Sequence, residues 1–377
     1  MSLSKSFKII VSVVLMGVML SGCMKTVHLK DLVVVEGFGI DSREDKVGIT
    51  VQTLNTATVT NGESPKGNIT LNTDDKGDTI VDAVAMLSKK FSKNLFFGQN
   101  KIIIFGREVA ETDFEKDLDY FLRSSDSRPD VAVCLSDSTA KEILESKEND
   151  AHIPSENIVS LLKTGQDSGV GAYVLTNELL NMYSDKTTDI YLPVIKKEKD
   201  SDSVQLKGIG LFNKNRLVYV TDDEETMGFL FISGKIKDCT VQFVDGELGH
   251  VGVEVSHIKI KKSVKIIDGN VNFQACVTAR IMIDEVEKGI ITSLDEEKIK
   301  RICTGTENEI TRLCQKAFAA CVDNNSDALR VGEYLAKDSP KSYDKLSDEW
   351  DTYFKTVKPL ISVNTQIKKI SDNTQLD

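Results

Sequence analysis

The sequence predicts a multidomain protein of mixed α/β and α+β class, with one or more N-terminal α/β units followed by an antiparallel-sheet domain covered by a long helix. Strand-like and helix-like segments alternate over residues 78–146, as in an α/β unit. Apolar and polar residues alternate strictly from Val271 to Ile283, which indicates a strand with one buried face. Apolar residues then recur every three or four positions over residues 295–323, which predicts the amphipathic helix that covers this face.

The N-terminal half begins with two predicted strands, residues 29–40 and 46–58, around the polar turn 41–45. Residues 59–77 are rich in Asn, Gly, Thr and Asp and predict a loop or an irregular strand. The elements expected next are a helix at 78–91 capped by Asp78, a strand at 100–105, a helix at 113–123, a strand at 129–135, a helix at 138–145 capped by Ser136 or Ser138, helices near 155–163 and 175–184, and an extended segment at 189–195.

The charged segment 196–205 is the clearest boundary in the chain, and the pattern beyond it changes. The expected elements are strands at 208–212 and 217–220, a helix at 224–231 capped by Asp222 or Asp223, and strands at 235–244, 251–260, 264–267 and 271–283. A slip in the apolar phase predicts a bulge near Ser256 and His257. The long helix, shorter helices at 327–336 and 341–354, and a strand at 360–370 follow.

The first 23 residues predict an exported lipoprotein. Lys5 and Lys8 precede Ile9–Leu20, an apolar stretch that is too short to span a bilayer but suits the core of a signal peptide. It ends in Leu20-Ser-Gly-Cys23, which is typical of a bacterial lipobox. We therefore expect a signal peptide over residues 1–22, cleavage between Gly22 and Cys23, and a lipid on Cys23 that holds the body at a membrane.

The charge of the chain argues against binding to nucleic acid. Lys and Arg number 47 against 58 Asp and Glu, which gives a net charge of −11. Such a chain is repelled by nucleic acid and by anionic lipid unless a local basic patch overrides the mean. The longest basic runs, residues 259–262 and 196–199, are interrupted by apolar or acidic residues. The sequence thus predicts no basic patch, and attachment to the membrane through the N-terminal lipid alone.

Motifs that carry chemistry are absent or incomplete in the sequence. The segment 165–169 departs from a serine-hydrolase elbow, and the Gly pairs at 37–39 and 208–210 lack the rest of a dinucleotide loop. Asp200 and Asp202 begin like a calcium loop, but Leu211 stands where its bidentate Glu belongs. We expect His250 and His257 to be surface or partly buried residues rather than ligands. The sequence therefore predicts no catalytic residue, no metal site and no cofactor.

Two further groups of residues leave alternatives open. The acidic run 222–225 is expected to be a solvated helix start, with a cation or partner contact as the alternative. Cys314 and Cys321 lie seven residues apart on the predicted helix, about 10 Å by rise and too far to bridge. They and Cys303 are expected to be small core residues, although disulfides among the six cysteines after Cys23 stay open.

The order of several segments resembles one family. These segments are LKDLVVVEGFGID (29–41), LFFGQNKIIIFG (95–106), SRPDVAVCLSDSTAKEIL (127–144), KGIGLFNKNRLVYVTDDEETMGFLFISGK (207–235) and EWDTYFKTVKPLISVNTQIK (349–368). Together with the lipobox they resemble the C-subunit lipoproteins of bacterial spore germinant receptors, the Ger(x)C family. Met24 and Lys25 stand where many relatives carry Trp, and Pro359 interrupts the run into the last strand.

The resemblance implies a non-enzymatic receptor subunit on the outer surface of the spore inner membrane, acting with membrane-embedded A and B subunits on small nutrients. It also implies three domains. We expect a strand-rich domain from residues 23–77 and about 176–200, a middle α/β domain at 78–175, and a C-terminal α+β domain at 205–370. Two other classes stay open: a solute-binding lipoprotein of a transporter, and an exported lipoprotein enzyme, which the missing motifs disfavour.

Overall fold

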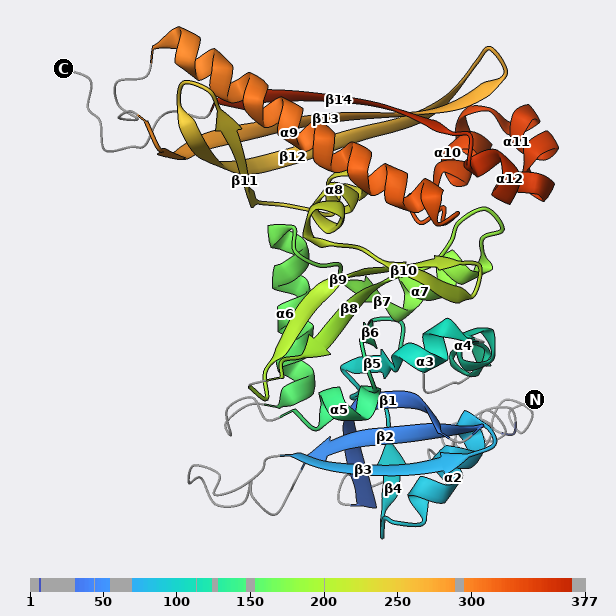
Figure 1. The fold of residues 1–377 in the computed structure, drawn as a ribbon. Helices are drawn as coiled ribbons and strands as arrows, with labels where there is room; N and C mark the ends of the chain where they lie inside the picture. Colours follow the sequence, from blue (N-terminus) through green and yellow to red (C-terminus); the bar gives the residue numbers. More distant parts are fainter. Residues whose placement is uncertain are drawn as a thin grey trace.

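The computed structural model describes residue 7 and residues 31–367, except residues 44, 55–69, 113, 124–127, 147–152, 200 and 289–294. Within these residues two β-sheets lie on either side of a buried helix, and further helices cover the sheet faces (Figure 1). No helix of this described part has the length and apolar character needed to cross a bilayer. The predicted fold class, mixed α/β and α+β, is confirmed.

The first sheet has ten strands and takes in the whole N-terminal half. Its main path runs β10-β9-β8-β6-β5-β1-β2-β3, while β4 pairs with β1 and β7 pairs with β6. The four central strands β1, β5, β6 and β8 are parallel, and antiparallel strands flank them on both sides. The ten strands are β1 (Leu32–Arg43), β2 (Lys46–Leu54), β3 (Thr70–Gly77), β4 (Asn94–Phe96), β5 (Ile102–Phe105), β6 (Ala132–Ser136), β7 (Val174–Leu175), β8 (Tyr191–Lys197), β9 (Val204–Asn213) and β10 (Arg216–Val220).

Helices cover both faces of this sheet, as parallel strands require. Apolar residues of α5 (Ala140–Leu144) and α6 (Pro154–Ser168) pack with β5 and β6 in one core cluster. The helices α2 (Ile80–Ser88), α3 (Arg107–Glu111), α4 (Phe114–Arg123) and α7 (Thr176–Ser184) contribute to the second cluster. The two clusters fix the sheet between helical layers.

A buried carboxylate ties α5 to the end of β1. Asp41 accepts hydrogen bonds from the backbone N–H groups of Ala140 (2.7 Å) and Lys141 (3.0 Å), which are the free donors of the first helical turn. The predicted turn over residues 41–45 is therefore too long, because β1 continues to Arg43 and buries Asp41. The predicted caps of these two helices are wrong: the side-chain cap of α5 is Thr139 rather than Ser136 or Ser138, and that of α2 is Thr79 rather than Asp78.

The second sheet has four strands, β11 (Cys239–Asp245), β12 (Gly249–Ile267), β13 (Asn270–Val286) and β14 (Lys358–Ile367). The segments predicted at 251–260 and 264–267 are one strand that bends at a register shift between Ser256 and Lys259, and His257 there has a φ of 53°. The predicted bulge is confirmed. The sheet is antiparallel except at its edge, where β14 pairs parallel to β13.

Helix α9 (Glu296–Asp323) crosses one face of this sheet, as the apolar stripe predicts (Figure 1). The helices α10 (Val331–Asp338), α11 (Pro340–Leu346) and α12 (Trp350–Phe354), with the short 3-10 helix η3 (Ser347–Glu349), return the chain to the start of β14. This long helical connection is needed because a parallel strand cannot follow its neighbour through a tight turn.

Helix α8 (Asp223–Ser233) lies between the two sheets and is buried on all sides near its C-terminal end. Phe229, Leu230, Phe231 and Ile232 are fully buried. The Phe229 ring packs against Tyr191 of β8 at 4.8 Å between centroids. On the other side α8 approaches α9 so closely that a methyl group on Gly228 would overlap the backbone carbonyl of Leu313. The apolar core therefore continues from one sheet to the other.

A buried polar junction joins the same two halves near α12. Asp327 accepts hydrogen bonds from the N–H groups of Val331 and Gly332 (both 2.7 Å) and from Trp350 Nε1 (2.9 Å). Asp189, just before β8, accepts from the N–H groups of Asp327 and Lys214 (both 2.7 Å). Burial raises the pKa of Asp189 to about 6 and raises that of Asp327 as well.

The predicted domain limits stay a prediction, although the pairing of strands crosses two of them. β3 ends at Gly77 within the same sheet as β5 and β6, and β8 pairs with β9 across the charged segment 196–205.

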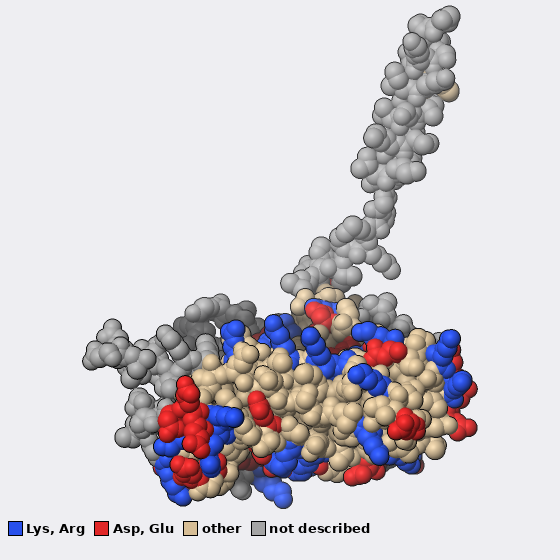
Figure 2. All heavy atoms as spheres, turned by 90° about the horizontal axis from the view of Figure 1, so that it is seen from above, with Lys and Arg blue, Asp and Glu red and all other residues tan. Residues whose placement is uncertain are grey.

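Figure 2, which views the molecule from above, shows acidic and basic side chains interspersed around a broad neutral area.

We predict that Gly228→Ala lowers the free energy of unfolding by about 2 kcal/mol, because the added methyl must push α8 away from α9. In an ordinary helix interior the same change would stabilise the protein by up to about 1 kcal/mol. Denaturant unfolding of the full chain measures the difference. Gly246→Ala is the matched control, since nothing lies within 4 Å of its added methyl. A neutral or stabilising Gly228→Ala would contradict the close contact.

Candidate functional site

A groove of about 830 Å³ runs between β11 and the N-terminal half of α9. Its walls combine apolar, polar and charged side chains from two segments that are distant in the sequence. They are residues 242–245 of β11 and Glu297, Lys300, Arg301, Thr304, Gly305, Asn308, Glu309 and Arg312 of α9. A volume in this range suits a small ligand or a short peptide segment.

A glycine in the middle of α9 sets the depth of the groove. A methyl group on Gly305 would overlap the ring of Phe243, so the helix can lie this close to β11 only with glycine there. Glycine in a helix interior costs up to about 1 kcal/mol relative to alanine, which the close packing must offset. A glycine at position 305, inside a predicted helix, is therefore the feature of the sequence that could have indicated the close contact between α9 and β11.

One end of the groove is fixed by Arg301. Its Nη2 lies 2.9 Å from both carboxylate oxygens of Asp245, at the end of β11. Hydrogen bonds from the Leu248 N–H and from Arg301 lower the pKa of Asp245 to about 2. The helix and the edge strand are thus joined by a charged pair at this end.

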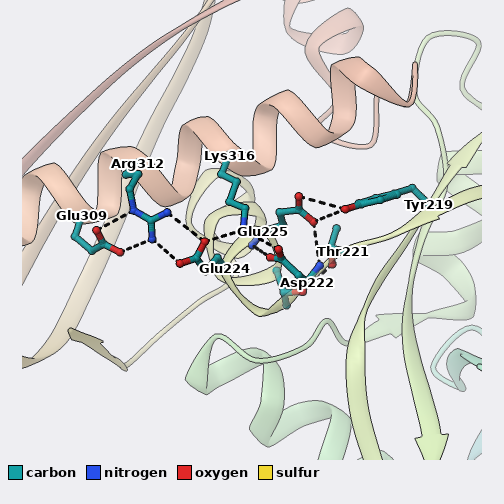
Figure 3. Close-up of polar contacts among 9 residues, drawn as sticks. Tyr219, Thr221, Asp222, Glu224, Glu225, Glu309, Arg312 and Lys316 are labelled. Atoms are coloured by element: carbon teal, nitrogen blue, oxygen red, sulfur yellow. Dashed lines mark hydrogen bonds and ion pairs between the residues drawn. The ribbon is translucent and has the colours of Figure 1, made fainter. Parts of the chain in front are cut away.

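The other end is fixed by Arg312, about 16 Å further along the helix by its rise. Figure 3 shows its guanidinium between Glu309 of α9 and Glu224 of α8. The N–O distances are 2.6 and 3.0 Å to Glu309, and 2.7 and 3.1 Å to Glu224. Lys316 Nζ lies 2.7 Å from both Glu224 and Asp222. Hydrogen bonds from Arg312 and then Lys316 lower the pKa of Glu224 to about 2.

The acidic run 222–225 begins α8, as predicted, and most of its carboxylates have partners within the chain. Asp222 caps the helix, and the Glu225 side chain accepts from the Asp222 N–H (2.9 Å), which completes a capping box. The Tyr219 hydroxyl, from β10, lies 3.0 Å from Glu225 (Figure 3). The run is a structural junction between β10, α8 and α9. The expectation of a solvated helix start is wrong at Glu225, which is buried.

The side chains that line the groove can bind a ligand. Arg301 and Arg312 already pair with carboxylates, so Lys300, Thr304 and Asn308 are left to contact a ligand. Val244 is 69% exposed at the rim. β11 is an edge strand of its sheet, and its outer backbone groups can pair with an added strand. The groove therefore suits an extended polypeptide segment or a small polar ligand.

The other residues that the sequence singled out do not meet at one place. His250 and His257 are exposed, as predicted, and the described residues contain no cluster of three His, Cys, Asp or Glu suited to a metal. Ser168 ends α6, where its hydroxyl donates to the Thr164 carbonyl. Gly22 and Cys23 lie outside the described residues.

The cysteines of the described part are all free, namely Cys134, Cys239, Cys276, Cys303, Cys314 and Cys321. Cys314 and Cys321 are fully buried in the stripe of α9, which confirms their prediction as core residues, and Cys303 is half-buried. Burial raises the pKa of each of these three thiols.

Two family models match nearly the whole chain. One, described as "Spore germination protein N-terminal domain", matches residues 25–197. The other, described as "Spore germination B3/ GerAC like, C-terminal", matches residues 207–371. The chain belongs to this spore germination family. The resemblance to the Ger(x)C family is thereby confirmed.

Individual relatives agree with the family models. The chain is 22% identical to "Spore germination protein KC" of Bacillus subtilis (strain 168), over 93% of each chain. It is 20% identical to "Spore germination protein B3" of the same organism, over 89% of this chain and 90% of the relative. The crystal structure of the GerBC protein has a TM-score of 0.58 at 16% identity and covers 88% of this chain and 97% of that chain, which shows the same fold.

We predict that Glu224→Gln removes an acid-sensitive part of the stability. The pKa of Glu224 is lowered from 4.5 to about 2 by folding. Its contribution is therefore present above the unfolded pKa and is lost as the pH falls from about 5 to about 2. The difference in free energy of unfolding between the wild type and Glu224→Gln should shrink over this window. Asp223→Asn, at an exposed neighbour, is the control, and a difference independent of pH would contradict the pairing.

Proposed function

We propose that this protein is the lipid-anchored C subunit of a spore germinant receptor, acting with membrane-embedded A and B subunits on the outer surface of the spore inner membrane. The observation that carries the proposal is the pair of family matches over residues 25–197 and 207–371, directly after the lipobox at Cys23. The relatives that cover most of the chain are named as spore germination proteins, which supports a role in the same process.

The residues that precede the first family match support the lipid anchor. Lys5, Lys8, the apolar stretch Ile9–Leu20 and the lipobox fit export followed by acylation of Cys23. Two acyl chains on one cysteine hold a protein at a bilayer firmly, whereas one chain gives only marginal binding. Anchoring also raises the effective concentration of the body beside partners in the same membrane.

The subunit contributes binding surface and does not convert the germinant. The groove between β11 and α9, together with the free edge of β11, is the partner contact that we propose. An extended loop of a membrane subunit could lie along the edge strand and place a side chain between Arg301 and Arg312. A solute-binding lipoprotein would instead bind a nutrient directly, which equilibrium binding to the purified chain can measure.

We predict that Cys23→Ala abolishes acylation, because it removes the thiol that carries the lipid. Incorporation of labelled fatty acid and fractionation of membranes measure the effect. Cys276→Ala, at an exposed cysteine of β13, is the control and should leave both results unchanged. Labelling and membrane retention that persist in Cys23→Ala would overturn the assignment of the anchor.

Deletion of the gene should abolish germination with one class of nutrient and leave the other classes intact, because each receptor serves its own germinants. Germination assays of the deletion strain against several amino acids and sugars test this. Chemical conversion of a nutrient by the purified protein would refute the non-enzymatic role.

The deletion strain also tests whether the groove between β11 and α9 is the partner contact. Complementation with Asn308→Trp, which fills the groove from its exposed α9 wall, should restore the protein level but not germination. Thr352→Trp, at an exposed position of α12, should restore both. Full germination with Asn308→Trp would exclude the groove as the partner contact.

A further inference from the structure

The four-stranded sheet has a second face that no described helix covers. Helices α8, α9 and α10 all pack on the face that carries Val277 and Phe273. On the opposite face the registers align β12, β13 and β14 in five successive rows of three residues. The rows are Ser256-Arg280-Gln366, Lys259-Thr278-Asn364, Lys261-Cys276-Ser362, Ser263-Gln274-Leu360 and Lys265-Asn272-Lys358.

Five of these positions are basic and none is acidic. Lys259, Lys261, Lys265, Arg280 and Lys358, which we call the basic face, are all exposed. None of the five makes an ion pair or hydrogen bond with another described side chain. The nearest acidic residues along β12 lie beyond the rows, Glu254 at one end and Asp268 in the hairpin turn at the other. In a chain of net charge −11, this is a local reversal of sign.

The prediction that the chain has no basic patch is therefore wrong. It rested on contiguous runs of Lys and Arg, whereas a strand places every second residue on one face. Lys259, Lys261 and Lys265 are interleaved with residues that point to the helical layer, and Arg280 and Lys358 come from two other strands. The patch appears only when the three strands are aligned.

Exposed aliphatic side chains lie at one end of the basic face. Leu360, in the fourth row, is 44% exposed, and Ile267, two residues after Lys265 on the same side of β12, is also 44% exposed. The five rows extend over about 27 Å, since each row follows the last by two residues of strand. Basic side chains spread over such a length, with aliphatic residues among them, are typical of surfaces that bind the headgroup region of a bilayer.

We propose that the basic face docks on an anionic phospholipid surface and orients the protein on the membrane that its N-terminal lipid reaches. The inference rests on the proposed function for the presence of a membrane, but the docking itself needs only the five cations. Mobile lipid headgroups can match cations spaced widely over a flat sheet, whereas an acidic protein partner would need carboxylates placed to fit them. Each cation near an anionic surface strengthens docking about fivefold.

The test uses the full chain carrying Cys23→Ala and Cys303→Ser, so that Cys276 is the exposed thiol left among the described residues. An environment-sensitive dye on Cys276, in the middle row of the basic face, reports contact with lipid. The labelled chain is mixed with vesicles of phosphatidylcholine alone or with about one-third phosphatidylglycerol. We expect a blue shift of the emission only with the anionic vesicles, and its loss at high salt because screening weakens the attraction.

Variants decide whether the basic face is responsible. Lys259→Ser with Lys261→Ser and Arg280→Ser should lower the ratio of docked to undocked protein about 100-fold. The control replaces three exposed lysines of the N-terminal half, Lys93, Lys186 and Lys199, with serine and should leave the ratio unchanged. If the triple variant unfolds, the single variant Lys261→Glu replaces it in the test, because the Lys261 side chain is exposed. This variant should lower the ratio of docked to undocked protein more than about fivefold.

Three outcomes would overturn the proposal: no shift with anionic vesicles, an equal loss in the control variant, or a larger shift with polyglutamate or RNA in the absence of lipid. The last would assign the basic face to an acidic macromolecule. Because this chain cannot be acylated at Cys23, a negative result leaves the anchor itself to the fatty-acid labelling experiment. Failure of docking and failure of the anchor are thus separate results.

Discussion

The burial of α8 between the two sheets is the constraint on which the rest of the architecture depends. A helix that is apolar on every side near its end can be stable only with a covering layer on each side. β8 supplies one layer through Tyr191, and α9 supplies the other through the contact at Gly228. The charged start of the same helix then meets Arg312 and Lys316, so α8 also fixes one end of the groove. The two sheets cannot separate without exposing this helix.

Polar groups set the geometry where apolar packing alone would leave it free. Asp327 satisfies three donors from α10 and α12, and Asp189 links that cluster to the first sheet. Burying a carboxylate costs free energy unless N–H groups donate hydrogen bonds to its oxygens. Each junction is therefore stable only with its donor groups in this one arrangement. By contrast, the cations of the basic face meet no such partner within the described part of the chain, which is why they point to an external one.

Much of the fold could be predicted from the sequence because its signals are local. Four such features depend only on residues close together in the sequence, and the structure contains all of them. They are the alternation from Val271 to Ile283, the apolar stripe of α9, the bulge near His257 and the helix cap at Asp222. The parallel pairing of β14, the groove and the basic face could not be predicted, because each depends on which distant strands become neighbours. The sequence predicts a turn at Asp41, because the N–H groups that this carboxylate binds belong to α5, about a hundred residues later in the chain.

The parallel pairing of β14 also determines the order in which the C-terminal half can form. Its partner β13 ends at Val286, and β14 begins only at Lys358, after the four α-helices α9 to α12 and the 3-10 helix η3. Until residues 358–367 have been synthesised, β13 is an open edge whose backbone groups can pair with another molecule. Closing so long a loop is slow relative to local helix formation. A chain truncated before Lys358 would therefore expose β13 permanently and aggregate, although every described helix of this half would still be encoded.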